Sequence, residues 1–191
     1  MKLRPCKLGA PLLVAIMLTG PHLPTWGQTL LTGDARLACE AILCLSSGVR
    51  PAACVPSLQR YFGISLSRWS RTLTARVNFL NLCPAVALDP NTRTLVHDIG
   101  NGAGRCDAAF LNATGLIPVG GHDSGQYVIN NVLPATCSAY TQNAYTDLQS
   151  VAPRYVGTPE ANGYWAESSL YTQALLDYNA QLAAQAAAAR N

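Results

Sequence analysis

Six cysteines between positions 39 and 137 constrain the fold of this chain of 191 residues more strongly than any other feature. Their number is even, and none of their spacings follows the C-x₂-C pattern that is typical of zinc sites. In an oxidising compartment such a set predicts three disulfides rather than a metal centre. The six residues are Cys39, Cys44, Cys54, Cys83, Cys106 and Cys137.

The first 27 residues have the layout of a secretory signal peptide. Residues 1–7 are basic, residues 8–20 form a mostly apolar run, and small residues at Thr25 and Gly27 precede a cleavage point before Gln28. A retained membrane span would need about 20 apolar residues, and this run is shorter. We therefore expect an exported protein with no stable membrane span after cleavage and with its cysteines in an oxidising environment.

Removing this leader changes the charge balance of the chain. The leader contains three basic residues and no acid, whereas the remainder contains ten arginines, ten acids and no lysine. A neutral remainder argues against a nucleic-acid-binding protein that neutralises many phosphates. Residues 28–80 hold six arginines and two acids, while residues 81–191 hold four arginines and eight acids. This asymmetry fits either two solvated faces or a basic patch that meets a partner.

Apolar periodicity predicts a mostly α-helical fold: a small disulfide-stapled helical domain with long irregular connections and a C-terminal helix. We predict one helix at 35–46 and a short second one from Pro51 to Gly63. A third helix ends before Pro84, with Arg68 and Arg71 opposite its apolar stripe. The stripe consists of Leu66, Trp69, Leu73, Val77 and Leu80.

The second half of the chain gives weaker signals. Prolines, asparagines and glycines predict an irregular connection at 84–104. Further predicted elements are a helix at 106–112, a strand at 127–133, a helix at 136–149, a linker at 153–159 and a last helix from Pro159. In the last helix Tyr164, Tyr171 and Tyr178 recur every seven residues, which favours docking onto the same chain over packing on a partner. The expected organisation is a signal peptide at 1–27, the helical domain at 28–152, and the linker with the C-terminal helix at 153–191.

Helical geometry limits which cysteines can pair. Cys39 and Cys44 lie on one predicted helix with side chains about 140° apart, so they cannot bond to each other. If the first two helices form a hairpin, Cys44 and Cys54 are nearly equidistant from the bend and make the best pair. The remaining pairs would be Cys39 with Cys83 and Cys106 with Cys137. They have no such geometric basis, and other connectivities stay open.

No combination of residues amounts to an active site. His97 and Asp98, with His122 and Asp123, carry the chemistry of a metal site, but both pairs fall in predicted loops without helical ligand spacing. His122, Asp123 and Ser124 are the residue types of a hydrolase triad, yet adjacent side chains rarely point at one another. We therefore predict no catalytic residue, no bound metal and no cofactor.

Residues 36–84 combine four of the cysteines with recurring arginine, proline and aromatic residues. The sequence reads CEAILCLSSG at 39–48, RP at 50–51, RYF at 60–62 and NFLNLCP at 78–84. In this combination it resembles the TrbM/KikA/MpfK family of conjugal transfer proteins. A weaker echo is RCDA at 105–108, and the C-terminal third adds nothing to the resemblance.

The resemblance implies an exported accessory protein of the mating-pair-formation type IV secretion system, located in the periplasm, which binds protein components of the channel or pilus. It supplies no catalytic residue, so a non-enzymatic role is expected. The candidate partner-contact residues are Arg50, Arg60, Tyr61, Arg68 and Arg71.

Two alternatives to this reading stay open. One is a periplasmic enzyme acting on the cell wall, which would require acids such as Glu40, Asp98 or Asp123 in one pocket. The other is a toxin-like host-range factor, which overexpression toxicity would reveal.

Overall fold

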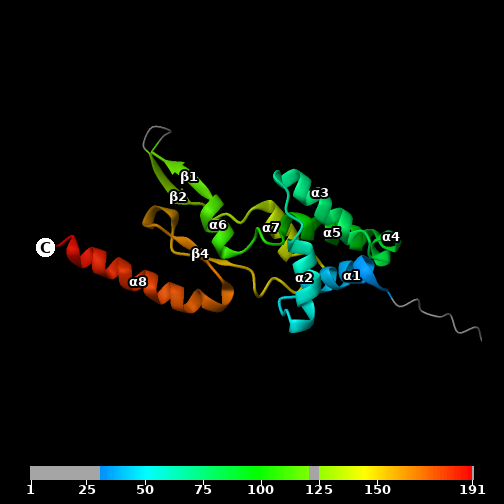
Figure 1. Cartoon of the computed structure of the whole chain (residues 1–191). Coiled ribbons are helices and arrows are strands. Elements are labelled where there is room, and N and C mark those ends of the chain that lie inside the picture. The colour runs from blue at the N-terminus through cyan, green and yellow to red at the C-terminus, as the bar shows by residue number, and fades with distance from the viewer. Residues whose placement is uncertain (1–30, 121–124, 191) are drawn as a thin grey trace, which may run out of the picture. The chain divides into compact units, whose positions relative to one another are not determined.

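The structure, a computed structural model, describes residues 31–120 and 125–190 (Figure 1). The predicted signal peptide at 1–27 lies outside the described residues, as do His122, Asp123 and Ser124. Within the described ranges the chain forms eight α-helices and two small antiparallel sheets. The predicted mostly α-helical class, with three disulfides and a C-terminal helix, is confirmed.

The three helices predicted first are present. Helix α1 (Gly33–Ser46) buries Ala38, Ala41, Ile42 and Leu45, whose spacing places them on one face. The short 3-10 helix η1 (Ala52–Cys54) leads into α2 (Val55–Phe62), in which Pro56 occupies the first turn.

Helix α3 (Trp69–Leu80) starts three residues later than predicted, because Leu66 donates its backbone N–H to the hydroxyl of Thr72 instead of joining the helix. Its buried face also differs from the predicted stripe. The buried side chains are Thr72, Arg76, Phe79 and Leu80, so that only Leu80 is common to both sets.

The prediction of an irregular connection at 84–104 is wrong. This stretch forms α4 (Pro84–Leu88) and α5 (Pro90–Gly102). Each proline takes a first-turn position, where its missing N–H does no harm, and Asp89 accepts hydrogen bonds from two backbone N–H groups at the start of α5.

The glycines of α5 serve packing rather than flexibility. A Cβ atom on Gly100 would lie 2.6 Å from Val77, and one on Gly102 would lie 2.5 Å from the side chain of Tyr140. Glycine therefore lets α3 and α7 approach the α5 backbone closely, and tertiary packing outweighs the low helix propensity of these residues.

Beyond α5 the elements are short. Helix α6 (Ala108–Thr114) precedes the hairpin of β1 (Leu116–Val119) and β2 (Gln126–Ile129). Helix α7 (Ala135–Thr141) ends eight residues before the predicted limit at 149, and its C-cap at Gln142 is followed by turns.

The predicted linker at 153–159 contains a strand, β3 (Arg154–Val156), which pairs antiparallel with β4 (Tyr164–Ala166). The 3-10 helices η2 (Pro159–Ala161) and η3 (Ser168–Leu170) follow β3 and β4. The last helix, α8 (Tyr171–Ala188), therefore begins twelve residues later than predicted, and Tyr164 belongs to β4.

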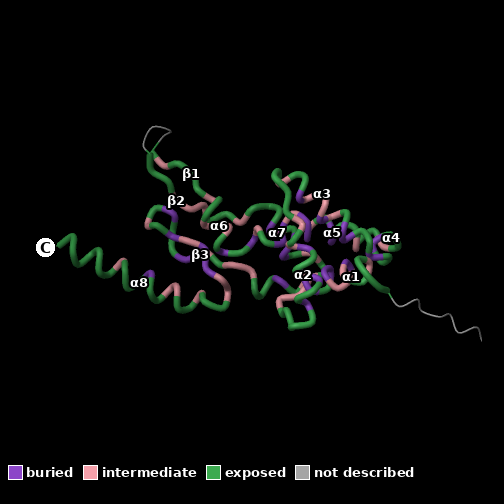
Figure 2. Tube along the Cα trace, viewed as in Figure 1, coloured by how far each residue is buried: buried purple, intermediate pink, exposed green. Residues whose placement is uncertain are grey.

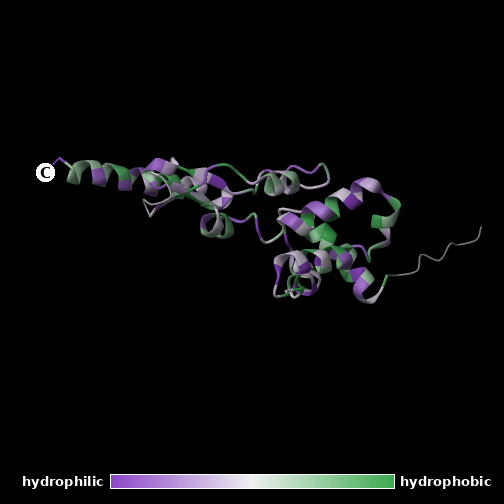
Figure 3. Ribbon diagram, turned by 90° about the horizontal axis from the view of Figure 1, so that it is seen from above, coloured by the Kyte–Doolittle hydropathy of each residue, from purple (hydrophilic) through white to green (hydrophobic). Residues whose placement is uncertain are grey.

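Helix α8 packs on the β3–β4 hairpin of its own chain, as the heptad spacing favours. Buried Tyr178 forms a small core with Val156 and Ala166 of the hairpin. The half-buried residues of α8 that pack against this core are Tyr171, Ala174, Leu175 and Leu182. Hydrophobic and hydrophilic residues alternate around α8 in Figure 3. No helix in residues 31–120 or 125–190 combines the length and apolar character needed to cross a bilayer.

The main core lies between α1, α2, α3, α5 and α7, where many of the buried stretches of the trace in Figure 2 are found. Its centre is occupied by Leu45, Tyr61, Leu80, Val96 and Ile99, which are almost completely buried. Removing this apolar surface from water is the main stabilising contribution to the fold.

Three disulfides join these helices. Cys39–Cys83 ties α1 to the end of α3, Cys44–Cys54 ties α1 to η1, and Cys106–Cys137 ties the start of α6 to α7. The preferred pair Cys44–Cys54 is present and closes the helical hairpin. The structure also contains Cys39–Cys83 and Cys106–Cys137, for which the sequence left other connectivities open.

Stacked cations and rings connect α2, α3 and α6. The guanidinium of Arg76 lies 4.9 Å from the ring centre of Tyr61 and 5.7 Å from that of Trp69, and it donates to two backbone carbonyls. On the same indole ring lies Arg105, at 4.4 Å, which also faces Phe110 at 4.9 Å. Each such contact contributes about 0.5–2 kcal/mol, depending on how far the cation is desolvated.

Candidate partner-binding surface

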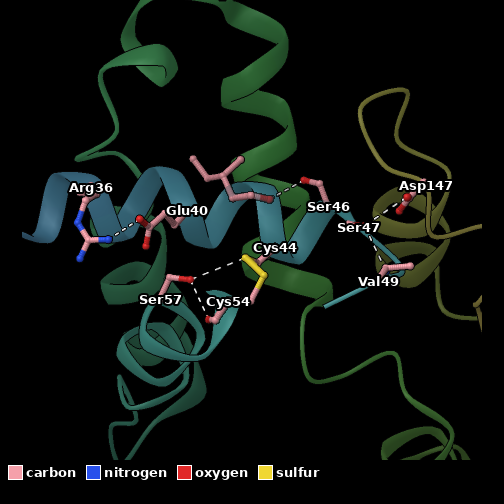
Figure 4. The surroundings of a disulfide bond; sticks show 10 residues. Arg36, Glu40, Cys44, Ser46, Ser47, Val49, Cys54, Ser57 and Asp147 are labelled. Atoms are coloured by element: carbon pink, nitrogen blue, oxygen red, sulfur yellow. Dashed lines mark hydrogen bonds and ion pairs between the residues drawn. A yellow bond between two sulfur atoms is a disulfide. The ribbon is translucent and has the colours of Figure 1, made fainter. Parts of the chain in front are cut away.

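The turn at 47–51, which joins α1 to η1, is held from a distant part of the chain (Figure 4). Gly48 donates its backbone N–H to Oδ1 of Asp147 at 2.5 Å, and the Ser47 hydroxyl donates to Oδ2 at 3.3 Å. Asp147 in turn donates its backbone N–H to the carbonyl of Ser46 at 3.0 Å. A carboxylate that accepts such bonds positions the turn without belonging to it.

An apolar groove lies on the side of this turn that faces the Cys44–Cys54 disulfide. Its volume is about 400 Å³. Leu43 is 70% exposed and Val49 is 74% exposed, although both are large aliphatic residues. The groove is lined by Glu40, Leu43, Cys44, Ser47, Val49, Pro51, Ala53 and Cys54. Exposed apolar residues gathered in one place are typical of a protein interaction site.

A second pocket, of about 420 Å³, is lined in part by other residues of the same turn. Ser47 lines both hollows, and Arg50 lies among the residues of the second one. We call this second hollow the Arg50 pocket. Its other lining side chains include Phe62, Asp107, Tyr140, Val151, Pro153 and Glu167.

The acids of the Arg50 pocket are already engaged at the start of α6. The backbone N–H of Ala108 donates to Glu167 at 2.7 Å, and that of Phe110 donates to Asp107 at 2.7 Å. These bonds cap the helix and partly compensate both negative charges. Arg50 is exposed and has no ion pair within residues 31–120 and 125–190.

Burial raises the pKa of the Tyr140 hydroxyl to about 12, while the nearby positive charge of Arg50 opposes part of that rise. The hydroxyl donates to the carbonyl of Leu45 at 2.5 Å. Tyr140 is therefore a neutral hydrogen-bonding group at physiological pH, and Arg50 supplies the positive charge on this side of the turn.

The five predicted contact residues have different environments. Arg50, Arg68 and Arg71 are exposed, and the last two lie at the start of α3 without an ion pair in the described part of the chain. Arg60 is also exposed, but it donates two hydrogen bonds to Asp34, at 3.2 and 2.8 Å. Pairing with Arg60 lowers the pKa of the Asp34 carboxyl, mainly through the side-chain hydrogen bond.

Tyr61 does not lie at the surface as a contact residue would. Its side chain is completely buried, its hydroxyl donates to the carbonyl of Ile99 at 3.3 Å, and burial raises its pKa to about 12. The aromatic ring that the sequence pattern marked is thus part of the core, because α5 covers it.

Of the residues considered for catalysis or metal binding, those that the structure describes are not gathered into one site. Glu40 forms an ion pair with Arg36, and Asp98 accepts a hydrogen bond from Asn143 at 2.8 Å. His97 is exposed, 3.8 Å from Asp98. Among the described residues no three or more His, Cys, Asp or Glu side chains are grouped as metal ligands would be.

The exposed aliphatic residues and Asp147 were not identified from the sequence. Leu43 falls outside the apolar face of α1, and a helical projection of 33–46 would have revealed it. Asp147 gives no such signal, because it is 99 residues from the backbone group that it binds.

A family model described as TrbM matches residues 30–179, which include the turn and both hollows beside it. No curated protein and no solved structure matches the chain.

Proposed function

The chain belongs to the TrbM family of conjugal transfer proteins. We propose that it is an exported accessory protein of the mating-pair-formation type IV secretion system. We propose further that it assists this system by binding protein components of the channel or pilus. In this proposal the protein acts in the periplasm, after removal of residues 1–27, and performs no bond-breaking chemistry.

The observation that carries this proposal is the exposed apolar groove beside an uncompensated arginine at the 47–51 turn. Aliphatic side chains that are exposed by 70% or more in the groove lose contact with water when a partner covers them. The disulfides support maturation in an oxidising compartment. The groove lies within the segment 36–84 that resembles the family most strongly.

The neighbouring turn is also prepared for binding. Asp147 holds two groups of the turn, and the Cys44–Cys54 disulfide joins its flanking helices. A surface that is already ordered loses little conformational entropy when a partner binds, which favours affinity.

The proposal is tested by complementation of a donor strain that lacks the gene. We expect Val49→Glu to lower transfer frequency strongly, because it places a charge in the apolar groove. Leu88→Glu is the matched control, since Leu88 is 84% exposed on α4 and lines neither hollow. Full transfer by the strain without the gene, or by Val49→Glu at normal protein level, would refute this role.

Export is tested separately by mass spectrometry of the protein from the periplasmic fraction. We expect the chain to begin at Gln28 and to carry no thiol that alkylates under denaturing, non-reducing conditions. A cytoplasmic chain that begins at Met1, or six free thiols in the mature chain, contradicts this part of the proposal.

A further inference from the structure

We infer that the groove and the Arg50 pocket together bind one segment of a partner protein that carries an acidic side chain between apolar residues. The acidic side chain meets Arg50, and the apolar residues cover Val49 and its neighbours. This inference rests on the proposed function, because it specifies the chemistry of the protein that the surface binds.

The charge of Arg50 selects an acidic group at this position. Both acids of residues 28–80 are neutralised within the chain, since Asp34 pairs with Arg60 and Glu40 pairs with Arg36. Arg50 is exposed without an ion pair in the described ranges, so a carboxylate is the complementary charge at this position. A guanidinium binds a carboxylate through paired hydrogen bonds, which gives geometric selectivity as well as charge.

The apolar groove determines which residues flank the acidic residue in the bound segment. Val49 lines the groove and Arg50, the next residue, lines the pocket. A bound segment that contacts Arg50 therefore lies next to Val49. The exposed side chains of Val49 and of Leu43, which lines the same groove, require apolar groups. A single partner segment can satisfy both requirements only if acid and apolar residues are neighbours within it.

The apolar part of the lining of the Arg50 pocket indicates that the segment continues beyond the acid. Phe62, Val151 and Pro153 line the pocket and offer further apolar surface. We therefore assign the carboxylate to an internal Asp or Glu and not to a chain terminus. Asp107 and Glu167 also line this pocket, and their charge disfavours a run of several acids.

The experiment uses random short peptides displayed on phage, which present no free carboxyl terminus, and the oxidised mature chain as bait. We expect the wild-type protein to enrich peptides with one Asp or Glu flanked by apolar residues. We expect Arg50→Glu to enrich peptides with Lys or Arg at that position. A selected peptide should lose about 10-fold or more in affinity for Arg50→Gln, as measured by calorimetry.

Arg68→Glu is the matched control, because it makes the same change of net charge at an exposed arginine that lines neither hollow. It should select the same peptides as the wild type. Unchanged selection by Arg50→Glu, equal effects of the two substitutions, or no enrichment at all would each overturn the inference. Circular dichroism and a thiol assay establish that each variant is folded and oxidised.

Two further results would contradict the inference in favour of another occupant. Binding restricted to synthetic peptides with a free carboxyl terminus would replace the internal acid by a chain end. A wild-type dimer that sedimentation equilibrium detects and Val49→Glu abolishes would make the occupant a second copy. The inference can fail in these ways while Val49→Glu still abolishes transfer, so its failure is distinguishable from failure of the proposed function.

Discussion

Removal of individual disulfides should destabilise the protein in the order of the loops that they close. The cysteines of the bridges Cys39–Cys83, Cys106–Cys137 and Cys44–Cys54 are separated by 44, 31 and 10 residues. A bridge restricts the unfolded chain more when its loop is longer. We therefore expect losses of about 4.0, 3.7 and 2.7 kcal/mol in the free energy of unfolding when each pair is replaced by alanine.

The comparison between the first and last of these pairs is the sharpest. Both pairs start on α1. Cys83, Cys54 and Cys44 are buried and Cys39 is half-buried, so replacement of Cys39–Cys83 does not leave the larger cavity. Because the shorter loop lies within the longer one, the effective length of the longer loop falls somewhat, which changes its contribution by only about 0.2 kcal/mol. The expected difference is thus about 1.3 kcal/mol in favour of Cys39–Cys83.

This difference is measured by urea denaturation of the mature chain and of the double alanine variants. Far-ultraviolet circular dichroism monitors the unfolding. The free energies of unfolding should fall in the stated order, and the m-value of each variant should rise because the unfolded chain expands when a bridge is removed. Thermal midpoints of the two variants should differ by roughly 3–5 °C. Equal losses, or a larger loss for Cys44–Cys54, would show that restriction of the unfolded chain is not the main contribution of these bridges.

Three further predictions concern the turn, the buried tyrosines and the C-terminal helix. Asp147→Ala should lower the free energy of unfolding by about 1–3 kcal/mol in thermal or urea unfolding, because it leaves the 47–51 turn without its acceptors. A loss near zero would contradict the role of this carboxylate. Burial raises the pKa values of Tyr61 and Tyr140 from 10.0 to about 12, so the folded state holds their protons longer than the unfolded state does. Their contribution to stability is complete below pH 10 and falls as pH rises toward 12, by roughly 3 kcal/mol for each tyrosine. Tyr61→Phe should remove about half of this pH-dependent loss in alkaline unfolding titrations. Gly157→Ala should release α8 from the β3–β4 hairpin, because Gly157 has φ +77° and a Cβ atom would lie 2.1 Å from the ring of Tyr178. Hydrogen exchange should then rise in α8 and not in α5. Unchanged protection of α8 would contradict this packing role.

Local patterns were sufficient for the first helices and for one disulfide pair. The apolar spacing of 35–46 places its residues on one face of a helix wherever that helix packs. The pairing of Cys44 with Cys54 follows from a hairpin of two short helices, because the bend brings residues at equal distances together. These features depend on neighbours along the chain, which a single sequence contains.

The helices at 84–102 and the environment of each candidate contact residue depend on segments far away. Gly100 and Gly102 favour a loop locally, but they are helical because Val77 and Tyr140 need space against the α5 backbone. Tyr61 and Arg50 belong to the same sequence pattern, yet α5 covers the tyrosine and leaves the arginine exposed. Burial and charge pairing depend on contacts between segments that are distant in the sequence. Periodicity and spacing can therefore predict which faces of a helix are apolar, but not which of these faces the folded chain leaves uncovered.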